Sequence, residues 1–156
     1  MGAAIFYHLT RQPLEAVLPV LLGRARDAGW RVVVRGTSKD RIEWLDEKLW
    51  LGPEDGFLPH GVDGGEFDAD QPILLTTKRG AENGAQCLMS IDGADVLADE
   101  IEKLERVCIL FDGNDPTSLD HARGQWKTLS EAGCKAQYWS QDSGKWEMKA
   151  EAKADK

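Results

Sequence analysis

Two kinds of hydrophobic pattern alternate along this chain. Short apolar runs rich in β-branched and aromatic residues predict strands that are buried on both faces of a sheet. Apolar positions that recur every three or four residues predict helices with one buried stripe. Strands are expected at residues 3–8, 31–35, 72–76, 86–91, 107–111 and 135–139. Helices are expected at residues 13–28, 39–50, 94–104 and 116–132.

The ends of the predicted helices carry recognisable signals. Pro116, for example, suits the first turn of a helix, and Gly133 suits the position just after one. The regular alternation of strands and helices predicts a single three-layer α/β/α domain with a mostly parallel, Rossmann-like sheet covered on both faces. We place this domain at residues 1–140 and expect residues 141–156 to form a polar tail that frays.

A long glycine-rich segment at residues 52–71 interrupts the pattern. It contains five glycines and one apolar island, Phe-Leu-Pro-His at 57–60. A loop of this length in a small domain is usually functional or mobile. Trp50 closes the helix before the segment and Phe57 begins the island, so the two could form an exposed patch that anchors a partner. The alternative is that both side chains fold the loop onto the core.

Length and composition limit the class of protein. The 156 residues, 42% of them hydrophobic, supply the core of one compact domain. The longest apolar run, 16–22, is interrupted by Pro19 and is shorter than the roughly 20 residues of a membrane-spanning helix. We also find no secretory signal at the start. The cysteines Cys87, Cys108 and Cys134 lack metal-type spacing, which predicts free thiols in a reducing cytoplasm.

Charge is distributed unevenly along the chain. The net charge is -8, which argues against a protein that binds phosphate along its whole surface. Residues 1–41 carry a net charge of +4, residues 42–116 hold eighteen acidic and five basic residues, and residues 117–149 carry +1. The acidic middle is either a solvated face or a surface for a basic partner.

Signals for nucleotide or metal chemistry are weak. The turn after the first strand, residues 9–13, contains no glycine, so the G-x-G-x-x-G and P-loop patterns are missing. His8, His60 and His121 belong to no cluster with metal-ligand spacing, and we expect structural roles for them. The sequence therefore predicts neither a cofactor nor a bound metal.

Two aspartates keep an enzymatic alternative open. Asp92 and Asp112 follow predicted strands, where α/β enzymes place catalytic groups and metals. Turn formation and helix capping explain the same residues. The alternative is a small α/β nucleotide-dependent or metal-dependent enzyme, such as a hydrolase, that uses these strand-end carboxylates.

The last predicted helix carries a basic and aromatic cluster. Arg123, Trp126 and Lys127 are spaced i, i+3 and i+4, which places two cations and an indole on adjoining ridges. Trp126 also belongs to the apolar stripe with Leu119, so it should stand at the boundary of core and solvent. Such a group can hold an apolar side chain against the indole and a carboxylate on the cations. A solvated helix face is the alternative.

Taken together, these motifs resemble the chi subunit family of bacterial DNA polymerase III. The resemblance covers about 140 residues and depends on the order and spacing of short motifs, each weak alone. The motifs are Phe6-Tyr7 with Leu9, the run 45–50 (Leu-Asp-Glu-Lys-Leu-Trp), the run 57–60, Ala122-Arg123, Trp126-Lys127 and Ala132-Gly133. The chain departs from the family pattern at Leu119, where a basic residue can occur, and at Trp126, where tyrosine is usual.

The resemblance implies a non-enzymatic replisome adaptor with a Rossmann-like fold. In that family, chi links the clamp loader, through the psi subunit, to the acidic C-terminal tail of single-stranded DNA-binding protein. It implies that Arg123, Trp126 and Lys127 bind this tail, which ends in an apolar residue and a free carboxylate. It also implies that Trp50 and Phe57 hold psi, a substitute for it, or a helicase. Contact with DNA would be indirect.

Direct binding of single-stranded DNA through the basic N-terminal third is a further alternative. Proteins of that kind interleave aromatic residues with their cations so that bases can stack. Residues 1–41 do not show this interleaving. The sequence therefore favours the adaptor over both the enzyme and the direct DNA-binding protein.

Overall fold

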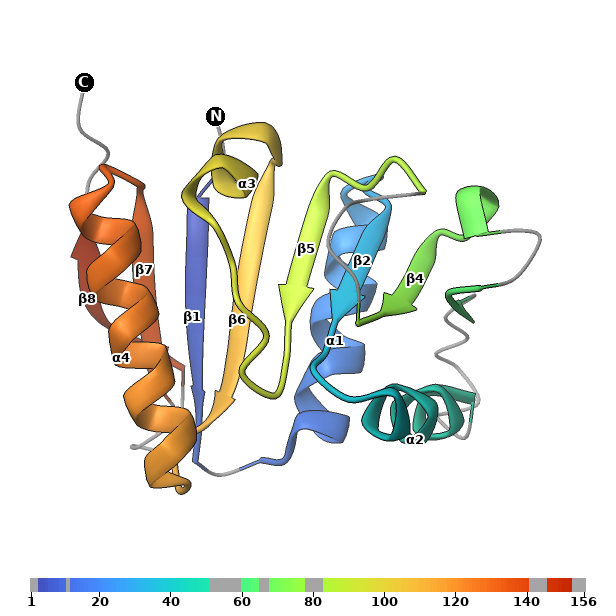
Figure 1. Ribbon diagram of the computed structural model, residues 1–156, viewed down its shortest axis with the longest axis horizontal. Coiled ribbons are helices and arrows are strands. Elements are labelled where there is room, and N and C mark those ends of the chain that lie inside the picture. The colour runs from blue at the N-terminus through green and yellow to red at the C-terminus, as the bar shows by residue number, and fades with distance from the viewer. Residues whose placement is uncertain are drawn as a thin grey trace.

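The computed structural model has an α/β fold, in which the described strands form one eight-stranded sheet (Figure 1). It describes residues 3–10, 12–50, 60–64, 68–77, 83–140 and 146–152. The strands are β1 Ala3–Leu9, β2 Val32–Arg35, β3 Gly61–Val62, β4 Ile73–Thr76, β5 Cys87–Ser90, β6 Arg106–Asp112, β7 Ala136–Ser140 and β8 Glu147–Ala152. The helices are α1 Leu14–Asp27, α2 Lys39–Trp50, α3 Ala98–Lys103 and α4 Pro116–Glu131, with a 3₁₀ turn at Asp68–Asp70.

The sheet has the strand order β3-β4-β2-β5-β6-β1-β7-β8. All pairs are parallel except β7 with β8, which run antiparallel. β1 lies between β6 and β7, with Ile5 aligned to Cys108 on one side and to Gln137 on the other. Helices α1, α2, α3 and α4 lie in the connections β1–β2, β2–β3, β5–β6 and β6–β7, as is usual between parallel strands.

The buried strand residues alternate between two cores. In β6, Cys108 and Leu110 join the core under α1 and α2, whereas Val107 and Ile109 join the core under α3 and α4. This alternation follows from the two-residue period of a strand. Figure 1 shows α3 and α4 on the near face of the sheet and α1 behind it. The predicted three-layer α/β/α fold with a mostly parallel sheet is confirmed.

The ends of α4 follow the predicted signals. Asp115 is the N-cap, and its carboxylate accepts a hydrogen bond from the Thr117 backbone N–H at 3.1 Å. Pro116 occupies the first turn, where no backbone donor is needed. Gly133 follows the helix with a φ of 84°, in the left-handed region that favours glycine. The position of α4 is therefore fixed at both ends.

Two sequence-based expectations were wrong. The helix expected at 94–104 is only Ala98–Lys103, because the preceding chain is held elsewhere: the Val96 backbone N–H donates to the Gln125 side chain at 2.8 Å. The tail expected to fray instead forms strand β8 at Glu147–Ala152, which pairs with β7. Polar side chains do not prevent an edge strand, because its backbone can still bond to a neighbouring strand.

The cysteines occupy the core, as expected. Cys87 and Cys108 are almost completely buried on adjacent strands. The hydrogen bond between them is the larger cause, and burial the second, that raises the pKa of the Cys108 thiol well above its ordinary value. Burial likewise raises the pKa of Cys134. They therefore act as small hydrophobic residues. None of the helices in the described ranges is long and apolar enough to span a membrane.

Candidate functional site

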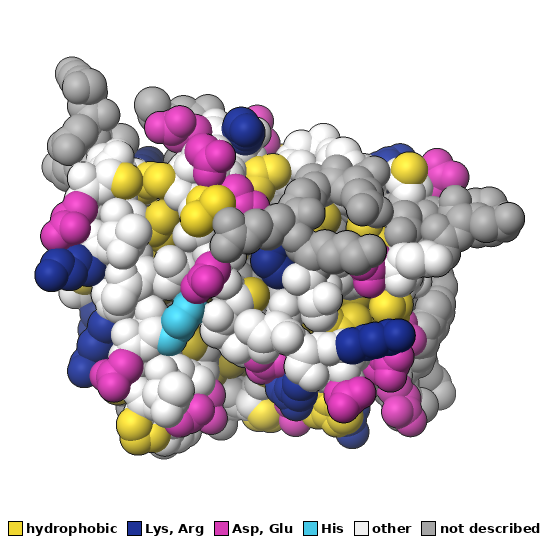
Figure 2. Space-filling view, viewed as in Figure 1, with side chains coloured by type: hydrophobic (Ala, Val, Ile, Leu, Met, Phe, Trp, Pro, Cys, Tyr) yellow, Lys and Arg dark blue, Asp and Glu magenta, His cyan; other side chains and the backbone are white. Residues whose placement is uncertain are grey.

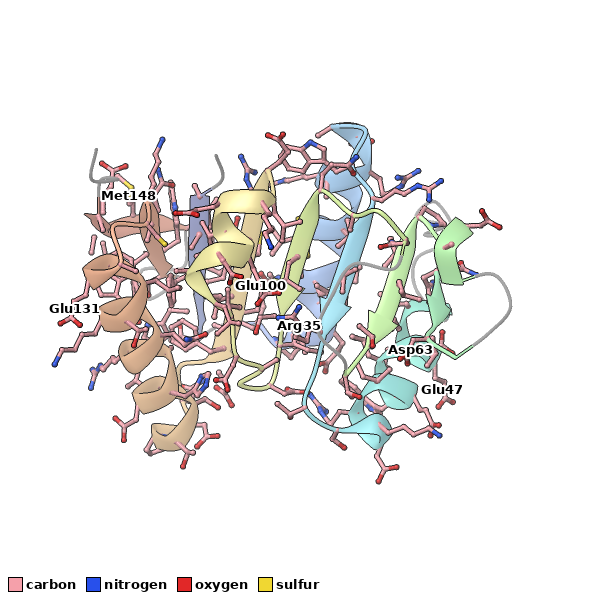
Figure 3. All side chains as sticks on the ribbon, turned by 45° about the horizontal axis from the view of Figure 1, so that its top comes forward. Arg35, Glu47, Asp63, Glu100, Glu131 and Met148 are labelled. Carbon is pink, nitrogen blue, oxygen red and sulfur yellow. The ribbon has the colours of Figure 1, made fainter. Side chains whose placement is uncertain are left out.

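A groove of about 340 Å³ lies between α4 and the two C-terminal strands. Its lining residues are Arg123 and Trp126 of α4, Tyr138 of β7, and Lys149 and Ala150 of β8. We call this the α4 groove. Figure 3 shows α4 and β8 at the same end of the sheet, where Glu131 and Met148 are labelled. The groove thus joins residues that lie up to 27 positions apart in the sequence.

Two aromatic rings form the apolar part of the α4 groove. The ring centroids of Trp126 and Tyr138 are 6.0 Å apart, with an interplanar angle of 83°. The fully buried Phe6 supports both rings, with its own ring centroid 5.3 Å from that of Trp126 and 6.3 Å from that of Tyr138. Edge-to-face and stacked contacts of this kind are favourable and restrict ring motion. The groove therefore has a preformed aromatic wall.

The Tyr138 ring is also held by a histidine. The Tyr138 hydroxyl lies 2.9 Å from His8 Nδ1, and the His8 ring stacks on Phe111 at a centroid distance of 5.2 Å. Gly113 lies against the His8 ring so closely that a Cβ at this position would collide with it. A glycine is therefore needed here for His8 to keep the contact. The hydrogen bond and the packing together orient Tyr138 toward the groove.

The cations of the α4 groove differ in their contacts. Arg123 is exposed, and within the described ranges it takes part in no ion pair. Lys149 Nζ lies 3.3 Å from a carboxylate oxygen of Glu147, and both side chains are about half exposed. In Figure 2, dark blue Lys and Arg side chains lie along the edge of the molecule that carries α4. The groove thus combines aromatic surface with positive charge.

This combination suits one class of ligand. An indole face can pack against an apolar side chain, and a guanidinium can donate two parallel hydrogen bonds to a carboxylate. A peptide end carries both groups on one Cα when its last residue is apolar and its carboxylate is free. The α4 groove is therefore chemically suited to an acidic peptide with an apolar C-terminal residue.

A second and larger hollow lies at the carboxyl ends of β1 and β6. This carboxyl-edge cleft has a volume of about 540 Å³, and its lining includes Arg41, Trp44, Asp92, Asp112 and Asn114. Both aspartates of the enzymatic alternative are therefore brought to one cleft. This is the edge at which α/β sheets commonly bind ligands.

Asp92 and Asp112 of the carboxyl-edge cleft already have partners within the protein. Asp92 accepts hydrogen bonds from Arg41 Nε at 3.0 Å and Nη2 at 3.2 Å, and these bonds raise the pKa of Arg41. The Arg41 guanidinium lies 4.2 Å from the centroid of Trp44. Asp112 accepts from the Asn114 backbone N–H at 2.9 Å. Across the described ranges, no group of three or more His, Cys, Asp or Glu side chains is arranged to hold a metal.

The two remaining histidines pair with carboxylates outside the α4 groove. His60 is buried and its Nε2 lies 3.0 Å from Asp46, while His121 Nε2 lies 2.9 Å from Asp95. Each pair joins segments distant in sequence, with the Asp46 carboxylate on α2 and Asp95 in the chain before α3. These contacts agree with the structural roles expected from the sequence.

Two of the five predicted site residues line the α4 groove. Arg123 and Trp126 meet in the α4 groove, and Trp126 is partly buried against the core, as its position on the apolar stripe predicted. Lys127 is exposed on the same helix but does not line the groove. The Trp50 side chain and Phe57 lie outside the described residues. Their predicted role as a partner patch therefore stays a prediction.

Three groove residues, Tyr138, Lys149 and Ala150, were missed in the sequence. Tyr138 lies in a predicted strand, and its distance of two residues from the buried Ala136 places it on the same sheet face. This two-residue spacing could have identified Tyr138 as a neighbour of the α4 stripe. Lys149 gave no such signal, because it lies in the segment that was expected to fray.

Comparison with known proteins identifies the family of this chain. A family model described as "DNA polymerase III chi subunit, HolC" matches residues 1–137. The "Probable DNA polymerase III subunit chi" of Rickettsia prowazekii (strain Madrid E) is 24% identical to this chain over 111 residues, which cover 68% of the chain and 67% of that protein. The residues matched by the family model include Arg123 and Trp126, whereas Tyr138 and the whole of β8 follow them.

Proposed function

This chain belongs to the DNA polymerase III chi subunit family, and from that premise we propose that it is a non-catalytic adaptor of the replicative holoenzyme. Its proposed ligand is the acidic C-terminal tail of single-stranded DNA-binding protein. By holding this tail, the adaptor links single-stranded DNA, which it does not itself contact, to the clamp loader and polymerase.

One observation carries the proposal: Arg123, an exposed cation, adjoins an aromatic wall that is already assembled. The wall is formed by Trp126 and Tyr138 and supported from the core by Phe6. Preformed apolar surface lowers the entropic cost of binding a flexible peptide. The charge and the wall together match a ligand with an apolar side chain and a carboxylate at one end.

The proposed mode of binding assigns each group a task. The last side chain of the tail packs on the Trp126 indole, and its terminal carboxylate takes hydrogen bonds from Arg123 one helical turn earlier. Lys127, exposed on α4 and adjacent to Trp126 in the chain, attracts the acidic residues that precede the end of the tail. Because this attraction acts through solvent, it weakens as salt is added.

We further propose that Trp50 and Phe57 contact the second partner. This partner is the psi subunit, a protein that replaces it, or a helicase. The support is the family membership and the aromatic character of both residues, since large aromatic side chains dominate the energetics of protein interfaces. Loss of psi or helicase capture by Trp50→Ala, with tail binding retained, would separate the two interfaces.

The first test is a calorimetric titration of the full chain with a peptide that copies the acidic tail of the host's single-stranded DNA-binding protein. We expect micromolar affinity that falls with salt and is lost when the terminal apolar residue is removed from the peptide. Arg24→Ala provides a matched control, because Arg24 is exposed on α1, on the other face of the sheet. Absence of binding at low salt would overturn the proposal.

A further inference from the structure

An irregularity in the last strand pair determines where Lys149 lies. In β7 and β8, Tyr138 pairs with Ala150, whereas the next residue, Trp139, pairs with Met148. Lys149 is therefore the extra residue of a β-bulge, with no partner of its own in the register. Bulges change the direction of a side chain relative to a regular strand and are common next to functional sites.

The bulge has a direct consequence for the α4 groove. In a regular strand, successive side chains point to opposite faces of the sheet. Lys149 and Ala150 are adjacent in the chain, yet both line the groove beside Tyr138. If the register of Tyr138 and Ala150 continued without the bulge, Lys149 would pair with Trp139, which lines a different hollow together with Tyr7 of β1. The bulge thus brings a cation to the aromatic wall.

The Lys149 ammonium already has a partner within the protein, the Glu147 carboxylate. Its Nζ lies 3.3 Å from the Glu147 carboxylate, and the two side chains are 45% and 48% exposed. An exposed pair at this distance is weak, because solvent screens both charges. A carboxylate of a bound peptide can therefore replace Glu147 at little cost.

We propose that Lys149 is a second cationic contact for the acidic tail and that Glu147 competes with the tail for it. This inference rests on the proposed function and assigns a specificity role to a strand beyond residues 1–137, the part matched by the family model. Lys149 binds an acidic side chain upstream of the tail's last residue. Arg123 takes the terminal carboxylate.

The division between the two cations follows from their chemistry and position. The planar guanidinium of Arg123 matches the geometry of a carboxylate and lies one turn from the Trp126 indole that holds the last side chain. Lys149 is a point charge on a flexible stem on the opposite wall of the groove, on β8. It can therefore reach side-chain carboxylates whose positions vary.

The test compares charge-changing variants of the full chain by calorimetric titration at low salt. We expect Lys149→Ala to weaken binding of the tail peptide about 3–5-fold, the upper part of the range for an exposed ion pair. Glu147→Gln should tighten binding by about 2-fold, because it frees Lys149. In the Lys149→Ala background, Glu147→Gln should have no further effect.

Matched controls separate this contact from general charge effects. Glu151→Gln removes one negative charge from the same strand, where Glu151 contacts Gln137 rather than Lys149. It should leave the affinity unchanged. If Glu151→Gln tightens binding as much as Glu147→Gln does, the competition is overturned and only net charge matters.

Two modified peptides test which carboxylate each cation binds. Amidation of the C-terminus should leave the loss caused by Lys149→Ala unchanged and remove the loss caused by Arg123→Ala. Replacement of the upstream acidic residues by their amides should remove the effect of Lys149→Ala. The opposite pattern would overturn the assignment.

Failure of this inference is distinguishable from failure of the proposed function. If the native chain binds the tail and Arg123→Ala weakens binding, but Lys149→Ala and Glu147→Gln change nothing, then Lys149 is no contact and the adaptor function stands. If the native chain does not bind the tail at all, both are overturned.

Discussion

The α4 groove and the carboxyl-edge cleft are both hollows lined by charged and aromatic side chains. They differ in how strongly their charged side chains are bound to other groups of the protein. In the cleft, Arg41 is held by two hydrogen bonds to Asp92, and Asp112 supports a turn. In the groove, Arg123 is exposed and takes part in no ion pair within the described ranges, and Lys149 has only a weak exposed partner. The groove therefore has charge to offer a ligand.

If the α4 groove is the binding site, as we propose, the volume of a hollow is a poor guide to function in this fold. The cleft is the larger hollow, about 540 Å³ against about 340 Å³, and it lies where α/β enzymes bind their substrates. Its polar groups stabilise local structure instead, and Asp92 even adopts a positive φ of 53° while holding Arg41. Charges satisfied within the protein should affect stability, whereas charges left for a ligand should affect binding.

The largest effect on stability should come from an ion pair that is almost completely internal. Arg35 of β2 and Glu100 of α3 point toward one another in Figure 3, with Nη2 and Oε2 2.6 Å apart and Arg35 only 3% exposed. Glu100→Ala leaves a buried guanidinium without its carboxylate, and we expect a loss of about 3 kcal/mol in the free energy of unfolding. Denaturant unfolding measures this.

Glu102→Ala, which changes an exposed residue on the same helix, is the matched control and should cost less than about 0.5 kcal/mol. The folded fraction of the Glu100→Ala protein should bind the tail peptide normally. If Glu100→Ala costs no more than this control, the internal pair does not stabilise the fold.

The next effect concerns binding rather than stability. Arg123→Ala should weaken tail binding by about 1–3 kcal/mol, the cost of losing a hydrogen bond to a charged group. Since Arg123 is exposed, the free energy of unfolding should change by less than about 0.5 kcal/mol. Arg123→Lys keeps the charge but loses the planar fork, so its affinity should be intermediate. Titration and denaturant unfolding of each variant separate the two effects. A variant that loses free energy of unfolding but keeps its tail affinity would contradict the assignment.

A smaller effect is expected in the carboxyl-edge cleft. Asp92→Asn removes one charge of a partly exposed ion pair, while asparagine still tolerates the left-handed backbone. We expect the free energy of unfolding to fall by less than about 1 kcal/mol and the tail affinity to stay the same. A variant that unfolds normally but loses tail affinity would place part of the peptide in the cleft.

The smallest effect concerns the enzymatic alternative. A ligand that binds only the folded state raises the melting temperature. Because Asp92 and Asp112 already have partners, Mg²⁺ or a nucleotide at millimolar concentration should shift the melting temperature by less than about 1 °C. A large, saturable shift that Asp112→Asn removes would support the enzyme instead.

The sequence was sufficient for the parts that depend on local periodicity. Helical spacing placed Arg123 beside Trp126 correctly, since both lie on one face of α4. The predicted start of α3 was wrong because the Val96 backbone N–H donates a hydrogen bond to Gln125 of another helix. No local pattern in the sequence reveals this contact. The bulge at Lys149 depends on how two strands align, and the alternation of side chains along one strand does not show it.

Whether the α4 groove binds the tail is tested most directly by following the backbone amide resonances of the full chain while the tail peptide is added. We expect shifts that concentrate on Arg123, Trp126, Tyr138 and Lys149, together with the Trp126 indole N–H. Residues of the carboxyl-edge cleft, such as Asp92 and Asn114, should remain unshifted. Shifts centred on the cleft, with α4 and β8 unchanged, would contradict the claim that the α4 groove binds the acidic tail.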